Sequence, residues 1–225
     1  MRPLGKVKIK WSPEFAYALG LLATDGNLSK DGRHIVFTSK DYELAQNFKK
    51  CLQLNNVIGL KSDKRRADKK YYRVQFGDVV FYQFLLSIGL HQRKTKTIGE
   101  VKIPQKYFFD FLRGHLDGDG TFYSYWDPRW KSSFMFYAVF ISASRSHIDW
   151  IRERLRGLLG VKGHLCRDGK KKSVWQLKYA KRESSSILGK VYYSNDLVCL
   201  TRKHKKIEKA LEIEYKHNNH ARVEK

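Results

Sequence analysis

Acidic residues are scarce in this chain. Its 225 residues include 45 lysines and arginines but only 22 aspartates and glutamates, which gives a formal net charge of +23. Solubility does not require such an imbalance, so the charge indicates a polyanionic partner. A membrane is disfavoured, because there is no apolar run of the roughly 18 residues that a spanning helix needs and no signal-peptide pattern at the start. Nucleic acid is therefore the expected partner.

Cysteines are also few, and no long glycine- or proline-rich linker interrupts the chain. The three cysteines, Cys51, Cys166 and Cys199, are odd in number and widely spaced, which fits neither a disulfide framework nor a paired zinc motif. This usage indicates a reduced, intracellular protein. Hydrophobic residues make up 42% of the chain and aromatic residues 14%, enough to build a packed core.

Two stretches carry the first functional signal. The sequences "ALGLLATDG" at 18–26 and "LRGHLDGDG" at 112–120 each read as a helix of small and apolar residues that ends in an acid and a glycine. A carboxylate at a helix C-terminus is opposed by the helix dipole, and a residue that is locally unfavourable is often functional. Asp25 and Asp119 are therefore candidate functional residues.

The two stretches belong to a longer internal repeat. The first motif recurs at an offset of 119 − 25 = 94, "FTS" at 37–39 meets "FIS" at 140–142 at an offset of 103, and "RKTKTI" at 93–98 meets "RKHKKI" at 202–207 at 109. An offset that grows in steady order is typical of two diverged copies with small insertions. We expect halves at residues 11–100 and 101–216, packed as one body, and a polar tail at 217–225.

Each half has the same expected order of elements. Ser12 and Pro13 open the first motif helix and Pro104 the second, two strands follow at 27–39 and 121–143, and a helix then leads into a hairpin. The hairpin strands alternate apolar and polar residues, which predicts antiparallel sheets with one polar face. The expected fold class is α+β.

The polar hairpin faces and their basic turns fit a DNA major groove, since Arg and Lys bond guanine, Gln bonds adenine and further cations contact phosphates. The predicted DNA-contacting residues are Lys64, Arg65, Arg66, Lys70, Arg73 and Gln75 in the first half and Arg167, Lys170, Lys171, Lys172, Gln176 and Lys178 in the second.

The motif helices predict a metal site. Small residues at four-residue spacing, such as Gly20 and Gly114, let two helix backbones approach closely, which would bring Asp25 and Asp119 together. Two adjacent carboxylates at helix ends repel each other unless a cation lies between them, and hard oxygen ligands favour Mg²⁺ or Mn²⁺. The predicted metal-site residues are Asp25, Gly26, Gly118 and Asp119.

These features resemble the LAGLIDADG homing endonucleases of the single-chain, double-motif type, over residues from about Trp11 to Tyr215. The resemblance implies two αββαββα halves related by a pseudo-twofold axis, with antiparallel sheets that form a saddle over DNA. It also implies a monomer that hydrolyses one phosphodiester on each strand of a long, pseudo-symmetric target. The protein would then act where the host DNA is, in a bacterial or archaeal cytoplasm or in an organelle.

The resemblance also assigns residue roles. The last motif acid, the family's metal ligand, is present in both copies as Asp25 and Asp119, whereas the sixth position is Ala23 in the first copy and Asp117 in the second. Lys94 and Lys203 match the family's basic active-site positions, with plain phosphate contact as the alternative role. Lys40, after the strand "IVFTSK", is a second candidate without a lysine counterpart.

Two other functions compete with site-specific DNA cleavage. An RNA-binding maturase that assists splicing of a host intron could use the same basic saddle. A DNA-binding regulator would need an added recognition domain, for which the roughly ten residues after Tyr215 are too few. The presence of both carboxylates favours cleavage.

Overall fold

The computed structural model describes residues 5–63, 66–167, 169 and 173–223. The first half runs, in order, through α1 (Pro13–Asp25), β1 (Gly26–Leu28), β2 (His34–Ser39), α2 (Tyr42–Cys51), β3 (Gly59–Asp63), β4 (Arg66–Gly77) and α3 (Val79–Ser87). The second runs through α4 (Phe108–Gly118), β5 (Thr121–Trp126), β6 (Phe134–Ser142), α5 (Arg145–Leu159), β7 (His164–Arg167), β8 (Trp175–Ala180) and α6 (Lys181–Val191). Both halves are therefore αββαββα, as predicted.

The two sheets confirm the duplication. Their strand orders are β1-β2-β4-β3 and β5-β6-β8-β7, and all pairs are antiparallel. Phe37 pairs with Val74 in the first sheet and Phe140 with Leu177 in the second, and both members of the second pair lie 103 positions after those of the first. The register of the two sheets is thus the one that the sequence offset predicts.

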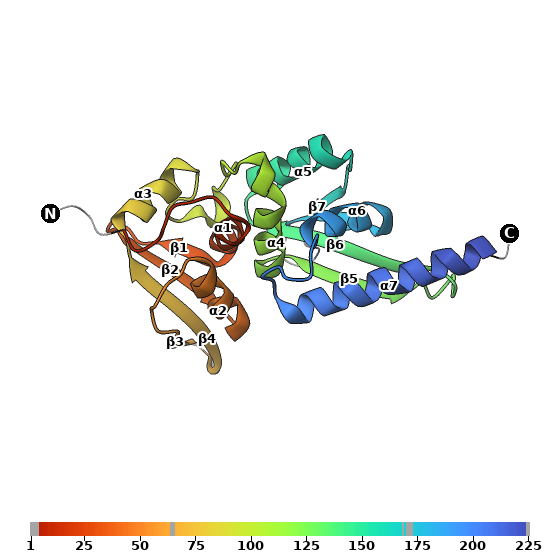
Figure 1. Cartoon of the computed structure of the whole chain (residues 1–225), viewed down its shortest axis with the longest axis horizontal. Helices are drawn as coiled ribbons and strands as arrows, with labels where there is room; N and C mark the ends of the chain where they lie inside the picture. The colour runs from red at the N-terminus through yellow and green to blue at the C-terminus, as the bar shows by residue number, and fades with distance from the viewer. Residues whose placement is uncertain (1–4, 64–65, 168, 170–172, 224–225) are drawn as a thin grey trace.

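Each sheet buries one face under helices. In the first half Phe37, Val74 and Phe76 are buried against α1, α2 and α3. In the second, Phe136, Phe140 and Leu177 are buried in an equivalent core with α5 and α6. Figure 1 shows α1 and α4 side by side at the centre, with one sheet and its helices on each side.

The start of the first motif helix is as predicted. Ser12 accepts a hydrogen bond from the Phe15 N–H at 3.1 Å, and Pro13 occupies the first turn, where no amide donor is needed. The second copy differs, because Pro104 precedes a 3₁₀ turn at Gln105–Tyr107 and α4 begins only at Phe108.

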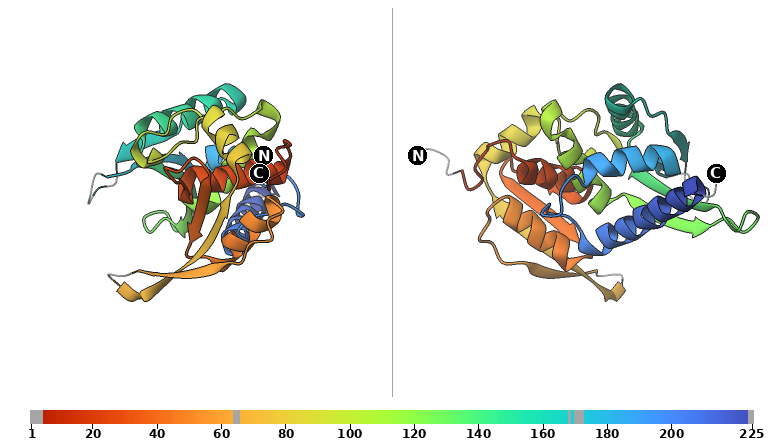
Figure 2. Two further views of the ribbon diagram at one scale, coloured as in Figure 1. Left: turned by 90° about the vertical axis from the view of Figure 1, so that its left-hand side faces the viewer. Right: turned by 45° about the vertical axis from the view of Figure 1, so that its right-hand side comes forward.

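The halves differ in their long hairpins. In the first half the longer strand belongs to the β3–β4 hairpin, which projects from the body in Figure 2, whereas β1 has only 3 residues. In the second half the β5–β6 hairpin is the long one, with strands of 6 and 9 residues. The growth of the offset from 94 at the motif to 103 at the next strand therefore corresponds to a longer hairpin in the second half.

A final helix was not predicted at its full length. α7 runs over Thr201–Val223, along the β5–β6 hairpin, so most of the segment expected as a polar tail is helical. Ile207 and Ala210 are buried in the second core, which anchors the first half of the helix.

Candidate metal and nucleic-acid site

Two glycines let the motif helices touch. A Cβ atom at Gly20 would lie 2.1 Å from the carbonyl oxygen of Phe111, and one at Gly114 would lie 2.1 Å from the carbonyl oxygen of Tyr17. Both contacts are with backbone, which cannot move aside cheaply. The close approach predicted from small-residue spacing is confirmed, and the contacts are reciprocal, as a pseudo-twofold axis requires.

This packing brings the two motif acids to the same end of the helix pair. Asp25 is the last residue of α1 and Asp119 directly follows α4. Burial and then the charge of Asp119 raise the pKa of Asp25 from 3.8 to about 7. Partial desolvation also raises the pKa of Asp119, against the pull of Lys94 and Lys203. The two carboxylates are close enough to repel each other.

Two buried lysines flank the carboxylates. Lys94 lies in the 3₁₀ turn Lys94–Lys96 and its Nζ donates to the carbonyl of Gly26 at 2.6 Å. Lys203, in the first turn of α7, donates to the carbonyls of Gly120 at 2.8 Å and Asp117 at 3.1 Å. Burial lowers the pKa of Lys94 to about 8 and also lowers that of Lys203. Both lysines are at most 7% exposed.

The hydrogen bonds of the two lysines to Gly26 and Gly120 are equivalent in the two halves. Lys94 and Lys203 are 109 positions apart, and the glycines that they contact, Gly26 and Gly120, are 94 apart, which are the offsets of the two copies. The predicted metal-site residue Gly118 is the counterpart of Thr24 and packs against its side chain. Asp25, Asp119 and the two lysines form one cluster, which we call the acid–lysine centre.

The donor set of this centre suits a hard divalent cation. Among the described residues, no group of three or more His, Cys, Asp or Glu side chains could hold a metal. Mg²⁺, however, is commonly held by one or two carboxylates, with water and substrate phosphate as the other ligands. The pKa of Asp25 is raised by burial and by the charge of Asp119, and a cation beside the two carboxylates would offset both effects.

The sixth motif position is structural in the second copy. The Asp117 carboxylate is buried and accepts hydrogen bonds from the Leu200 N–H at 2.7 Å, the Tyr17 hydroxyl at 2.9 Å and the Tyr192 hydroxyl at 3.3 Å. Ala23 at the equivalent place of the first copy is buried, and its side chain cannot accept a hydrogen bond. Alanine in place of the motif aspartate therefore removes a side-chain acceptor from the first half. The candidate metal ligand Asp25 is retained.

Arg113 is a buried residue that sequence reasoning did not single out. It is 1% exposed, pairs with Asp110 at 2.9 Å, and donates to the carbonyls of Val191 and Val198 at 3.0 Å each. The available signal was its charge at an apolar position of a motif helix. Arg113 holds the connection between α6 and α7.

Four of the predicted hairpin residues lie on the sheet faces away from the helices, namely Arg73, Gln75, Gln176 and Lys178. Arg73 and Gln75 alternate with the buried Val74 and Phe76 on β4, and their side chains hydrogen-bond each other. Lys70 and Arg167 are also exposed, but they lie on the strand faces that carry the buried residues, and Arg167 lies over the ring of Trp175. Gln176 and Lys178 are half-buried on the corresponding face of β8.

Lys64, Arg65, Lys170, Lys171 and Lys172 lie outside the described residues, and Arg66 is described only as part of β4. Lys40 is exposed beyond β2, with its Nζ 5.9 Å from the ring centroid of Tyr71.

The open face of the second sheet carries a row of tyrosines. The rings of Tyr123 and Tyr137 are nearly parallel, with centroids 5.1 Å apart, and those of Tyr125 and Tyr137 are 6.3 Å apart. The signal in the sequence was the two-residue spacing of Tyr123 and Tyr125 on one strand.

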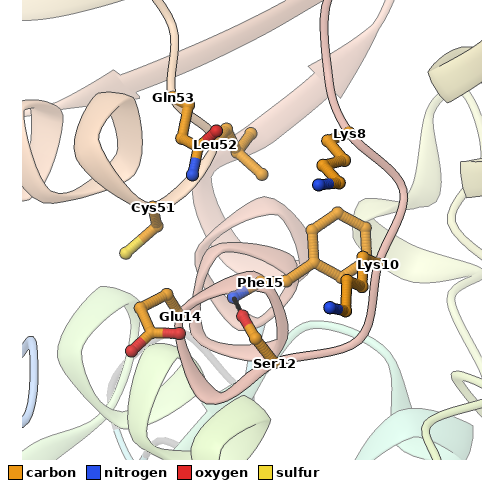
Figure 3. Close-up of a pocket in the computed structure, with 8 residues that line it drawn as sticks. All are labelled: Lys8, Lys10, Ser12, Glu14, Phe15, Cys51, Leu52 and Gln53. Atoms are coloured by element: carbon orange, nitrogen blue, oxygen red, sulfur yellow. Dashed lines mark hydrogen bonds between the residues drawn. The ribbon is translucent and has the colours of Figure 1, made fainter.

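A separate concavity lies at the other end of α1. Figure 3 shows it lined by Lys8, Lys10 and Glu14 beside the capping Ser12, with Cys51 opposite. It adjoins the N-terminus of the helix, whereas Asp25 ends the C-terminus. The concavity is therefore not part of the acid–lysine centre.

None of the helices in the described part of the chain combines the length and apolarity needed to cross a bilayer.

Comparison with known proteins gives a family match for one half and structural matches for most of the chain. Residues 12–97 match the family model described as a LAGLIDADG-like domain. No curated protein sequence matches.

Several solved structures are similar to this chain. The structure of the I-LtrWI LAGLIDADG homing endonuclease bound to target DNA is 11% identical, with a TM-score of 0.57 over 92% of each chain. I-DmoI in complex with DNA and Mn is 16% identical, with a TM-score of 0.52 over 81% of this chain and 98% of that one.

The third is full-length DUF199/WhiA from Thermatoga maritima, which is 14% identical, with a TM-score of 0.56 over 92% of this chain. This chain spans only 63% of that protein's length. At these identities the likeness concerns the fold, and the fold alone does not determine the chemistry.

Proposed function

We propose, from its LAGLIDADG homing endonuclease fold with two sheet-bearing halves and from the LAGLIDADG-like match over residues 12–97, that this chain is a site-specific endonuclease. It would make a double-strand break in a long, pseudo-symmetric DNA target by metal-dependent phosphodiester hydrolysis. The proposal rests on the acid–lysine centre, because one acid and one lysine recur at equivalent positions of the two halves.

Asp25 and Asp119 would hold the divalent ion, Mg²⁺ or Mn²⁺. When bound, such an ion supplies a more acidic water and a positive charge beside the leaving oxygen. The structures of I-DmoI in complex with DNA and Mn, and with DNA and Ca, support the use of divalent ions on this fold.

The lysines have a distinct role in this proposal. Lys94 and Lys203 are held by backbone carbonyls beside the two acids, so their ammonium groups are positioned before substrate arrives. A fixed cation next to a phosphate stabilises the negative charge that develops in the transition state. Each half would therefore provide one cation for one scissile phosphate.

The two sheets would hold the duplex. The first presents Arg73 and Gln75, whose side chains can bond guanine and adenine edges. The second presents Gln176 and Lys178 together with the tyrosine row. Because these faces differ in chemistry, the two half-sites of the target would differ in sequence.

End-mapping of a fragmented DNA library tests the proposal. The library includes the host gene in the form that lacks the intron or other inserted element carrying this coding sequence. It is incubated with Mg²⁺ and either the wild type or an Asp25→Asn, Asp119→Asn double variant. Discrete double-strand ends from the wild type alone are expected. No discrete ends from either protein, with tight binding to the host intron RNA, would refute the proposal and favour the splicing maturase.

A further inference from the structure

The two lysines of the acid–lysine centre occupy equivalent positions but are supported by different neighbours. We propose that Asp117 is a positioning residue for Lys203 alone, so that its loss slows cleavage of one DNA strand and spares the other. This inference rests on the proposed endonuclease function and adds a residue role to it.

Asp117 fixes the start of the helix that carries Lys203. Its Oδ2 accepts the Leu200 N–H at 2.7 Å, and the Leu200 carbonyl in turn accepts the N–H groups of Lys203 at 2.9 Å and His204 at 3.0 Å. These two bonds form the first turn of α7. The buried carboxylate is thus one hydrogen bond away from the turn that sets the Lys203 backbone.

The same connection is held from a second side. Arg113 donates to Val191 at the end of α6 and to Val198 two residues before Leu200. Tyr192, inside the connection, donates its hydroxyl to Asp117 at 3.3 Å. Removal of the Asp117 acceptor would therefore free the Leu200 end while Arg113 keeps the rest of the chain in place.

The first half supports Lys94 differently. Ala23 stands where the second half has Asp117, so it offers no side-chain acceptor. Instead Gln92, two residues before Lys94, donates to the Tyr82 hydroxyl at 2.7 Å, and Tyr82 donates to the Ser29 carbonyl at 2.5 Å. The described contacts around Lys94 thus rely on α3 and the β1–β2 turn, whereas those around Lys203 rely on a motif acid.

This difference predicts two strand-specific phenotypes. In Asp117→Ala the Leu200 N–H and the hydroxyls of Tyr17 and Tyr192 lose their acceptor. A hydroxyl can turn toward another acceptor, whereas a buried unpaired backbone N–H shifts its own segment toward water or another partner. Lys203 would then be misplaced at one scissile phosphate, while Lys94 would keep its position at the other. Gln92→Ala is the matched variant of the first half and should affect the opposite strand.

The experiment measures cleavage of each strand separately, on a cognate duplex labelled at one 5′ end at a time, after Mg²⁺ is added to preformed complex. Lys203→Met first identifies the strand that Lys203 serves. Asp117→Ala should slow that strand at least tenfold, leave the other within twofold, and accumulate nicked DNA. Asp117→Asn should restore near-wild-type rates, because its amide oxygen can still accept from Leu200 and its amide nitrogen can donate to Tyr192.

Equal slowing of both strands by Asp117→Ala, or no slowing, would overturn the inference, as would failure of Asp117→Asn to restore the rate. A wild type that cuts no DNA would instead refute the proposed function. Hydrogen exchange then tests the positioning by itself. Amides 200–204 should exchange at least tenfold faster in Asp117→Ala than in wild type, with amides 94–98 unchanged, and unchanged exchange at 200–204 would overturn it.

Discussion

The buried negative charge of Asp25 should lower the free energy of unfolding of the metal-free protein above about pH 7. The pKa of Asp25 is raised from 3.8 to about 7, by burial and by the charge of Asp119. Folding therefore favours the neutral carboxyl group. This contribution to stability is fully present below pH 3.8 and is lost as the pH rises through about 7.

Replacement of Asp25 by Asn removes the cost of that charge. A rise in pKa from 3.8 to about 7 corresponds to about 4 kcal/mol, which is the upper value for the gain in free energy of unfolding at pH 8. At pH 4 the gain should fall below about 1 kcal/mol, because the wild-type group is then largely protonated. The gain should also shrink when a divalent ion stabilises the wild type.

Urea unfolding at pH 4, 6 and 8 in EDTA measures this effect, with repeats in 10 mM Mg²⁺ at the highest pH. The exposed Asp196→Asn is the control for a change of net charge, and it should alter stability little and equally at each pH. A gain for Asp25→Asn that does not grow between pH 4 and pH 8 would refute the reasoning, since burial and repulsion would then not act on this carboxylate.

Four further predictions concern binding, packing and acid stability. Asp25→Asn together with Asp119→Asn should abolish cleavage yet bind duplex DNA at least as tightly as wild type in a gel-shift assay, and weaker binding by a folded variant would contradict this. The logarithm of the DNA association constant should fall with log salt at a slope near −9 if about ten phosphates are contacted, whereas a slope shallower than about −3 would mean diffuse charge. Gly20→Ala should cost about 3 kcal/mol or more in thermal or urea unfolding because it meets backbone, while Gly157→Ala, which meets nothing within 4 Å, should gain about 0.5–1 kcal/mol. Burial lowers the pKa of His147 to about 4, so stability should fall as the pH drops from 6.5 to 4, by about 3 kcal/mol from this residue, and His147→Gln should flatten that fall.

The internal repeat could be predicted from the sequence because the same residue types recur in the same order in both halves. Small residues, acids and lysines recur at set offsets, and the paired strands reproduce those offsets in space. The acid–lysine centre could therefore be predicted down to Asp25, Asp119, Lys94 and Lys203. Their metal and catalytic roles stay predictions.

The supports of the centre could not be predicted, because they depend on contacts between distant segments. Asp117 accepts from Leu200, 83 positions away, and Arg113 reaches Val198, 85 positions away. No local pattern encodes such partners. The length of α7 was missed for another reason: beyond Ile213 its residues are mostly polar, so apolar periodicity ends before the helix does.

The backbone contact at Gly20 and Gly114 fixes the spacing of the two motif acids independently of the surfaces that would bind DNA. It sets the distance between the acidic ends of the motif helices by the thickness of two peptide backbones, and a side chain at either glycine would collide with a carbonyl oxygen. The sheet faces that would read DNA lie on other elements and can change without moving those backbones. If the chain binds DNA as proposed, its target preference can change through the sheet faces while the spacing between the two acids stays constant.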